Sequence, residues 1–542
     1  MTSTESLQGL PGVEATLADL QARDIVARIW QRDHTVWKPE PTEIANRLGW
    51  LTVTAQMRQD LPSLTALADA VRSEGYKHVV LLGMGGSSLG PEVLRQTFGS
   101  APGYPELLVL DSTVPAWIQA VGNSIDPART LFLVSSKSGG TIEPLSLYRH
   151  FRGLVNAAVG ESKAGAHFVA VTDPGTPLET LAEEQGFRRA FANPADIGGR
   201  YSVLSYFGLV PAALIGVDVA ELLDRADGMR DSCAAGVSVE NNPGAYLGAV
   251  MGTAALAGKD KLTLITSPSI GSFGLWVEQL IAESTGKEGT GIVPIAGEPV
   301  LSPEFYGDDR LFAYLRVQND DNADLDAQVD ALESAGHPTV RLNLADTYDL
   351  GAEFFRWEFA TAIASAVMGI HPFDQPNVQQ AKNLTDQVLG EYQATGALPS
   401  AETSKSVEDL LGDAQGSDGY LAIMAYVRPT PETERALTAL RRKILERKHL
   451  PTTMGYGPRF LHSTGQLHKG GPASGYYLQI TVDRQEDIAV PGAPYTFGTL
   501  ADAQAIGDLQ ALEATGRRAA AVRLAEVTEA AIAAVGDALV GK

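Results

Sequence analysis

The sequence has little cysteine, a shortage of positive charge and no long apolar run, and each shortage excludes a class of protein. Among 542 residues Cys233 is the single cysteine, so no internal disulfide can form, and no cysteine and histidine spacing resembles a zinc site. With 42 Lys and Arg against 65 Asp and Glu, the formal net charge is −23. This balance argues against binding nucleic acid or an anionic membrane, because both need clustered basic residues.

The chain shows no targeting or membrane segment. The first residues, MTSTESLQGLPGVEA, contain neither a basic stretch nor an apolar one, and no run of about 18 uncharged apolar residues occurs. We therefore expect a cytoplasmic protein without membrane contact. A content of 44% hydrophobic and 20% charged residues is typical of a globular protein, and the length suggests roughly three or four units.

Short apolar runs separated by helix-like segments predict strands that are buried on both faces of parallel sheets. Four such runs follow Lys77, three more lie at 261–267, 311–317 and 339–344, and YLAIMAYV and YYLQITVD lie beyond 415. Helices are expected over 14–35, near 242–257, over 350–369 and 431–448, and in the alanine-rich tail. The polar segment 384–418 reads as a linker or insertion. The sequence predicts an α/β protein with these parts: a helical arm over 1–70, two α/β domains over 71–235 and 236–415, and a smaller C-terminal α/β unit over 416–542.

A glycine-rich turn follows the first predicted strand. In GMGGSSLGP, Gly85, Gly86 and Ser87 would present backbone N–H groups and a helix start to an anion. The turn lacks the third glycine of a dinucleotide fingerprint, since Ser88 occupies that position. Asp111, near the end of the second strand, keeps a dehydrogenase as an alternative.

A second polar loop follows the third predicted strand. In SSKSGGTIE, residues Ser136, Lys137, Ser138 and Thr141 combine hydroxyls, backbone amides and one cation around a phosphate monoester. The pattern indicates a sugar-phosphate pocket more than a nucleotide pocket. The alternative is a solvated loop that only caps the next helix.

Five motifs then occur in an order that resembles the phosphoglucose isomerases, which carry two sugar isomerase (SIS) domains. The motifs are GMGGSSLGP, SSKSGGTIEP, DIGGRYS from residue 196, AESTGK from 282 and FDQPNVQQAK from 373. The early ARIWQRDHTVWKPEP and the late LHSTGQLHKGG further resemble the isomerase half of bacterial transaldolase/phosphoglucose isomerase fusions. The resemblance implies that both domains are SIS-type three-layer α/β/α folds with mainly parallel sheets.

The resemblance also implies catalytic roles. Glu283 would be the base that moves a proton between C2 and C1, because a desolvated carboxylate can work near neutral pH. Arg200 would face the negative charge of the enediolate, and Lys382 would act in ring opening. The alternatives are a surface Glu283, an Arg200 paired with Asp196 and a surface Lys382. Glu278 is expected to be structural.

The chain departs from the family pattern in three places. The phosphate loop lacks one threonine, Gln379 stands where the family has Glu, and the usual ring-opening histidine about thirty residues after the base is missing. We expect His468 or His462 to replace it, with His371 or water as alternatives. A histidine from that late loop would bring the C-terminal unit into the active site.

The function implied is a metal-independent glucose-6-phosphate isomerase of glycolysis and gluconeogenesis. We expect a small phosphorylated sugar as substrate, no cofactor, no metal and a homodimer. Two alternatives stay open, namely an isomerase with mannose 6-phosphate or amino-sugar specificity and a non-catalytic sugar-phosphate sensor.

Overall fold

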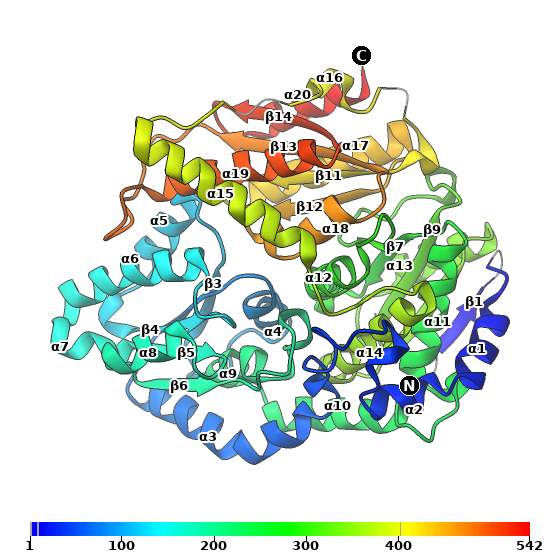
Figure 1. The fold of residues 1–542 in the computed structure, drawn as a ribbon, viewed down its shortest axis with the longest axis horizontal. Helices are drawn as coiled ribbons and strands as arrows, with labels where there is room; N and C mark the ends of the chain where they lie inside the picture. The colour runs from blue at the N-terminus through cyan, green and yellow to red at the C-terminus, as the bar shows by residue number, and fades with distance from the viewer. Residues whose placement is uncertain (1–2, 8–9, 401–402, 413, 542) are drawn as a thin grey trace.

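The computed structural model describes residues 3–7, 10–400, 403–412 and 414–541. Three sheets divide this part of the chain, and helices pack around each of them (Figure 1). Every strand pair in them is parallel except one at the edge of the second sheet. The α/β class predicted from the short apolar runs is therefore confirmed.

The first sheet has the strand order β3-β2-β4-β5-β6. Alternate residues of β2 point into two different cores, because successive side chains of a strand face opposite sides. Val79 and Leu81 join one apolar cluster, and Val80 and Leu82 join another. The strands and helices of this unit are β2 (His78–Leu82), β3 (Glu106–Leu110), β4 (Thr130–Ser135), β5 (Phe168–Thr172), β6 (Arg189–Ala192), α3 (Val53–Ser73), α4 (Leu89–Phe98), α5 (Pro115–Ser124), α6 (Ile142–Val159), α7 (Glu161–Ala164), α8 (Pro177–Glu184), α9 (Tyr206–Leu214) and α10 (Val219–Ser232).

The second sheet has the order β1-β10-β9-β7-β8, in which the N-terminal strand β1 pairs antiparallel with β10. Helix α14 is almost wholly buried and packs along α11. The elements are β1 (Ser3–Ser6), β7 (Lys261–Thr266), β8 (Val293–Ile295), β9 (Arg310–Val317), β10 (Thr339–Leu344), α11 (Pro243–Leu256), α12 (Phe273–Thr285), α13 (Ala323–Ser334) and α14 (Leu350–Met368). The arm expected to be helical thus also supplies an edge strand.

The third sheet, at the top of Figure 1, has the order β12-β11-β13-β14 and is wholly parallel. Helix α15 lies along α19 (Figure 1), so the start of the segment expected to be a linker is helical as far as Thr395. The alanine-rich tail contains a strand, β14, before its last helix. The elements are α15 (Pro376–Thr395), α16 (Val407–Leu410), β11 (Tyr420–Ala425), α17 (Pro431–Lys448), β12 (Thr452–Tyr456), α18 (Gly465–Gly470), β13 (Gly475–Val482), α19 (Phe497–Ala514), β14 (Arg518–Leu524) and α20 (Glu529–Val540).

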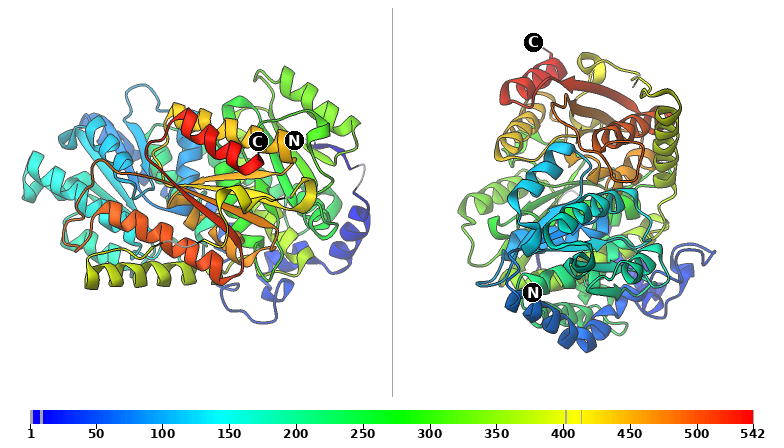
Figure 2. Two further views of the ribbon diagram at one scale, coloured as in Figure 1. Left: turned by 90° about the horizontal axis from the view of Figure 1, so that it is seen from above. Right: turned by 90° about the vertical axis from the view of Figure 1, so that its left-hand side faces the viewer.

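Shared cores hold the three sheets together. One apolar cluster contains Phe132 and Phe151 of the first sheet unit together with Leu421 and Leu478 of the third sheet. The views in Figure 2 show the third sheet resting against the first two. Buried apolar area of this kind is the main favourable term in folding, so the C-terminal unit is an integral part of the molecule.

The N-terminal arm packs on the second sheet unit. Its helices α1 (Val13–Ala22) and α2 (Ile25–Trp30) are interrupted at Asp24, whose φ of 51° is left-handed. The rings of Trp30 and Trp50 lie against Phe355 of α14, with centroids 6.4 and 5.8 Å apart. No described helix is both long and apolar enough to cross a lipid bilayer.

Candidate active site

A cavity of about 760 Å³ lies where the carboxyl end of the first sheet meets the second sheet unit and the C-terminal unit. Parallel sheets commonly place ligands at this end. The cavity is lined by all but one of the residues predicted to act on or bind the substrate. Those that line it are Gly85, Gly86, Ser87, Ser136, Lys137, Ser138, Thr141, Arg200, Glu283, Lys382 and His462.

The glycine-rich turn forms the short helix η3 (Gly85–Ser87) and is squeezed between two other segments. A Cβ atom on Gly86 would lie 1.9 Å from the carbonyl oxygen of Gly199, and one on Gly85 would lie 2.5 Å from that of His462. Gly85 also has a φ of 55°, which favours glycine. These glycines therefore let the chain segments that carry Arg200 and His462 approach closely.

The second polar loop gathers hydroxyls at the start of α6. Ser136 Oγ lies 3.0 Å from Thr141 Oγ1, and Ser138 Oγ lies 3.5 Å from the same atom. Lys137 forms an ion pair with Asp173. Burial raises the pKa of Asp173, and Lys137 opposes that rise. One cation, three hydroxyls and a helix start thus converge, as phosphate binding requires.

Arg200 is held on every side by polar partners. It lies in η6 (Gly199–Tyr201) and is 2% exposed. Its Nε donates to Ser284 Oγ at 2.9 Å, and its Nη1 lies 2.9 Å from Gln375 Oε1 and 3.4 Å from Glu283 Oε2. The alternative pairing with Asp196 does not occur, because that carboxylate bonds Arg32 instead.

Glu283 lies near the end of α12 and is 7% exposed. Besides Arg200, it accepts a hydrogen bond from Gln279 Nε2 at 3.2 Å. Burial raises the pKa of Glu283, and the charges of Arg200 and His462 only partly offset that rise. The surface position weighed as an alternative is therefore excluded, and the group has the environment of a general base.

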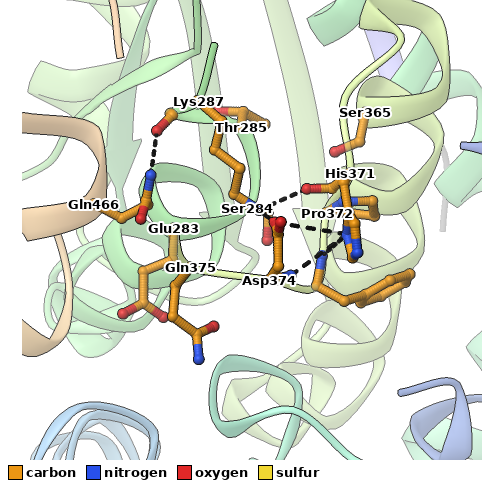
Figure 3. Close-up of polar contacts among 12 residues, drawn as sticks. Glu283, Ser284, Thr285, Lys287, Ser365, His371, Pro372, Asp374, Gln375 and Gln466 are labelled. Atoms are coloured by element: carbon orange, nitrogen blue, oxygen red, sulfur yellow. Dashed lines mark hydrogen bonds and ion pairs between the residues drawn. The ribbon is translucent and has the colours of Figure 1, made fainter. Parts of the chain in front are cut away.

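An ion pair fixes the loop that faces Glu283. Lys287 Nζ reaches Asp374 Oδ1 at 2.6 Å and the carbonyl oxygen of His371 at 2.5 Å (Figure 3). Burial lowers the pKa of Lys287 to about 7. In Figure 3 the side chains of Glu283 and Gln375 point away from this contact. Both side chains instead lie within hydrogen-bond distance of Arg200 Nη1. The contacts of Lys287 with Asp374 and the His371 carbonyl fix the loop at 371–375. They therefore set the position of Gln375 and of the two carbonyl groups in this loop that accept hydrogen bonds from Arg200.

His371 serves this loop and does not line the cavity. Its Nε2 lies 3.0 Å from the carbonyl oxygen of Thr42, and its Nδ1 accepts from the amide of Phe373 at 3.1 Å. Because both ring nitrogens are engaged, the structure gives His371 a bracing position.

His462 enters the cavity from the C-terminal unit. Its Nε2 lies 2.8 Å from Glu143 Oε1, which also accepts from Gln504 Nε2 at 2.7 Å. Burial acts to raise the pKa of Glu143, but the charge and hydrogen bond of His462 and the charge of Lys382 outweigh it, so this pKa is lowered. Sequence reasoning gave Glu143 no role, although it ends the SSKSGGTIE loop.

The expectation for His468 is corrected by its position. The ring is 2% exposed, lies 5.1 Å from that of Tyr477, and is not among the groups that line the 760 Å³ cavity. Neither ring nitrogen has a hydrogen-bond partner in the described part of the chain, and burial lowers the pKa of His468 well below its usual value. The ring therefore lies outside the cavity that holds Glu283 and Arg200, and the structure does not bring His468 together with them.

Lys382 lies on α15, close enough to Glu143 for its charge to lower the pKa of that carboxyl group. Its side chain is exposed and lines the cavity beside Gln379. Within the described ranges, no group of three or more His, Cys, Asp or Glu side chains is placed to hold a metal ion.

Comparisons with known proteins agree with this geometry. A family model described as phosphoglucose isomerase matches residues 52–293. A glucose-6-phosphate isomerase of Rubrobacter xylanophilus is 31% identical over 393 residues, which cover 61% of this chain and 87% of that relative. The chain belongs to the phosphoglucose isomerase family. Another relative, a glucose-6-phosphate isomerase of Nostoc punctiforme, is 28% identical over 441 residues, covering 71% of this chain and 81% of its own.

Solved structures support the family's fold. A hypothetical protein of Thermus thermophilus has a TM-score of 0.59 at 26% identity, covering 72% of this chain and 100% of its own. A glucose-6-phosphate isomerase of Chlamydia trachomatis has a TM-score of 0.60 at 19% identity, covering 70% and 86%. The predicted SIS-type fold is confirmed.

Proposed function

We propose that the chain is a glucose-6-phosphate isomerase that interconverts glucose 6-phosphate and fructose 6-phosphate through an enediolate. The observation that carries this proposal is the buried Glu283 carboxylate beside Arg200, in a cavity that also holds the loop built for a phosphate. The family membership supports the same reaction class.

Proton transfer is assigned to Glu283. In the open-chain aldose its carboxylate takes the C2 proton, and the C–H electron pair forms the C1=C2 bond while negative charge moves to O1. The same group returns the proton to C1, and the O2 hydroxyl proton passes to O1 to leave the ketose. Because burial raises the pKa of Glu283, the carboxylate is a stronger base than an exposed one.

Arg200 supplies fixed positive charge next to that base. Its donors are already held by Ser284, Gln375 and the loop at 372–374, so the guanidinium need not reorganise when charge develops on the sugar oxygens. This arrangement favours the enediolate over the neutral sugar.

Ring opening is assigned to His462, with Lys382 as the nearby cation. Glu143 accepts from His462 Nε2 and thereby fixes the imidazole, so the other ring nitrogen serves the sugar. The phosphate would lie on Ser136, Lys137, Ser138 and Thr141, which places the sugar chain between Glu283 and His462. We also propose that the enzyme acts in the cytoplasm as a homodimer.

A pair of variants on one helix tests the base. We expect Glu283→Gln to lower kcat by about 10² to 10⁴-fold, while binding of glucose 6-phosphate changes little because the phosphate loop is intact. Exchange of the C2 hydrogen with D₂O, followed by NMR, reports the proton transfer directly.

Glu278→Gln is the matched control, since this residue is on the same helix but does not line the 760 Å³ cavity. It should keep the activity. Normal C2 exchange in Glu283→Gln would remove Glu283 from the role of base.

A further inference from the structure

A second cavity, of about 530 Å³, lies on the other side of α12 and shares no lining residue with the 760 Å³ cavity. Its wall includes Met424 of β11 and Tyr456 of β12, near the carboxyl ends of both strands. Ligands of parallel sheets favour this end, and the volume is within the range of small-molecule pockets. The first sheet unit and the second also contribute to the wall, through Trp117 and Glu278.

Two arginines present unused donors to this cavity. Arg459 donates from Nε to Asp111 Oδ2 at 2.7 Å, and its guanidinium lies over the ring of Trp117 at 5.5 Å. Arg441 donates from Nε to Thr452 Oγ1 and from Nη2 to two carbonyl oxygens. Within the described residues, both terminal nitrogens of Arg459 and the Nη1 of Arg441 lack hydrogen-bond partners.

Buried polar side chains on the same wall are also unsatisfied. The hydroxyl of Ser272 and both ring nitrogens of His468 have no partner in the described part of the chain, although these residues are only 9% and 2% exposed. Buried polar groups are normally hydrogen-bonded. These atoms are themselves covered by neighbouring side chains, so the polar contacts of a ligand in this cavity fall to the two arginines.

Two of the three carboxyl groups at this wall already have polar partners, and the third is Glu278. Glu92 bonds Arg95 through both oxygens at 2.8 Å, and Glu434 accepts from the hydroxyl of Tyr456 at 2.8 Å. The donors left over therefore belong to cations, which selects an anion. The apolar wall beside them, formed by Trp117, Val109 and Met424, suits a flat ring.

We propose that this second cavity is a binding site for a small aromatic anion, one with a phosphate, sulfonate or carboxylate on a flat ring system. The anionic group would bond Arg441 and Arg459, and the ring would lie against Trp117. The proposal does not depend on the isomerase reaction, because the two cavities have separate walls.

A matched pair of probes tests the chemistry. 8-Anilinonaphthalene-1-sulfonate carries the rings and an anion, and N-phenyl-1-naphthylamine carries the same rings without the anion. We expect saturable one-to-one fluorescence titration with the sulfonate and at least tenfold weaker binding of the neutral amine. Equal affinity for the two probes, or no saturation with the sulfonate, would overturn the proposal.

Three variants locate the bound probe. Thr438 is exposed and lines this cavity, so Thr438→Trp should block it and abolish probe binding while isomerase activity stays normal; Ala439→Trp, on the next exposed residue of α17, should change neither. Lys137→Ala in the other cavity should leave probe binding intact. Retained binding in Thr438→Trp, or loss in Lys137→Ala, would place the probe elsewhere.

The pH dependence provides an independent readout. Burial raises the pKa of Glu278 to about 8, so this group is a neutral hydrogen-bond donor below that pH and a repelling carboxylate above it. The other charged or titratable groups that face it around the cavity are Glu92, Arg95, Glu434, Arg441, Arg459 and His468. Sulfonate affinity should fall as pH rises through about 8 in the parent chain and stay level in Glu278→Gln, and a level parent profile would contradict this contact.

Discussion

At the scale of single residues, the proposed active site separates two carboxylates by their surroundings. Burial raises the pKa of Glu283. Burial also acts to raise the pKa of Glu143, but His462, a backbone hydrogen bond and Lys382 together outweigh it and lower that pKa. Groups whose environments push their pKa values apart take different parts in acid–base chemistry. Glu283 is thus suited to accept a proton, and Glu143 is suited to remain ionised and hold His462.

This difference predicts how the pH profile responds to Gln279. The base must be ionised, so kcat/KM should fall as pH drops through the pKa of Glu283, which lies above the ordinary 4.5. Gln279→Leu removes a hydrogen bond that lowers this pKa, so the acid limb should move up by as much as about 1 pH unit.

The control is Gln387→Leu at an exposed position of α15. It should leave unchanged the pH at which kcat/KM falls on the acid side of the profile. An acid limb that stays at the same pH in Gln279→Leu would show that another group controls it.

Single residues were also where sequence reasoning was weakest. The motifs named Glu283, Arg200 and Lys137, and all three line the cavity, because each stands next to glycine or serine at a strand or helix end. His462 and His468 share one loop and looked equivalent in sequence. Only the packing of the His468 ring against Tyr477 separates them, and no local pattern encodes that contact.

At the scale of elements, the strands that could be predicted from the sequence are those with long apolar runs. Strands that are very short or rich in alanine could not be predicted. β2, β4 and β11 are wholly or almost wholly buried, so their sequences are continuously apolar. β8 has only three residues, and β14 reads RAAAVRL, whose alanines favour a helix when taken alone. Pairing with β13 overrides that preference in β14.

Helix α14 carries an uncompensated carboxyl group that predicts a pH-dependent stability. Glu358 is 0% exposed, and neither of its oxygens has a partner in the described part of the chain. Burial raises the pKa of Glu358 well above its ordinary value, so folding takes up a proton once the unfolded group has ionised. Below pH 4.5 Glu358 is protonated in both the folded and the unfolded chain, and its burial does not make the free energy of unfolding depend on pH. As pH rises from 4.5 toward the pKa in the folded chain, the unfolded chain is increasingly favoured and the free energy of unfolding falls.

Glu358→Gln removes the ionisable group and with it this pH dependence of the free energy of unfolding. We expect the stability of the variant relative to the parent to rise by about 1.4 kcal/mol per pH unit between about pH 5.5 and 7, as measured by urea unfolding. Glu391→Gln, at an exposed position of α15, should show no such slope. A difference independent of pH would mean that Glu358 is ionised in the fold.

At the scale of the whole molecule, one chain supplies every group proposed for the reaction. Glu283 comes from the second sheet unit, Lys137 from the first and His462 from the C-terminal unit, and all line one cavity. The shared apolar core between the first and third sheets holds His462 in place. Assembly of this site therefore needs no histidine from a neighbouring subunit.

This arrangement predicts the result of mixing inactive subunits. When Glu283→Gln and His462→Ala chains are co-expressed with different tags and purified as mixed dimers, we expect no recovery of isomerase activity, because each cavity keeps its own defect. Recovery to about a quarter or half of the parent activity would show that the histidine crosses between subunits. Dimers of parent chain with His462→Ala should keep about half the activity and serve as the reference.

The position of His462 in the chain has a consequence for biosynthesis. Gln466, four residues beyond it, bonds the carbonyl oxygen of Gly286 and the side chain of Asn377, so the end of α12 is fastened by a segment that the ribosome makes much later. The proposed base Glu283, Arg200 and the proposed phosphate loop all leave the ribosome before Gln466 can make these contacts. We therefore expect a nascent chain to have no isomerase activity until most of its last domain has left the ribosome and folded.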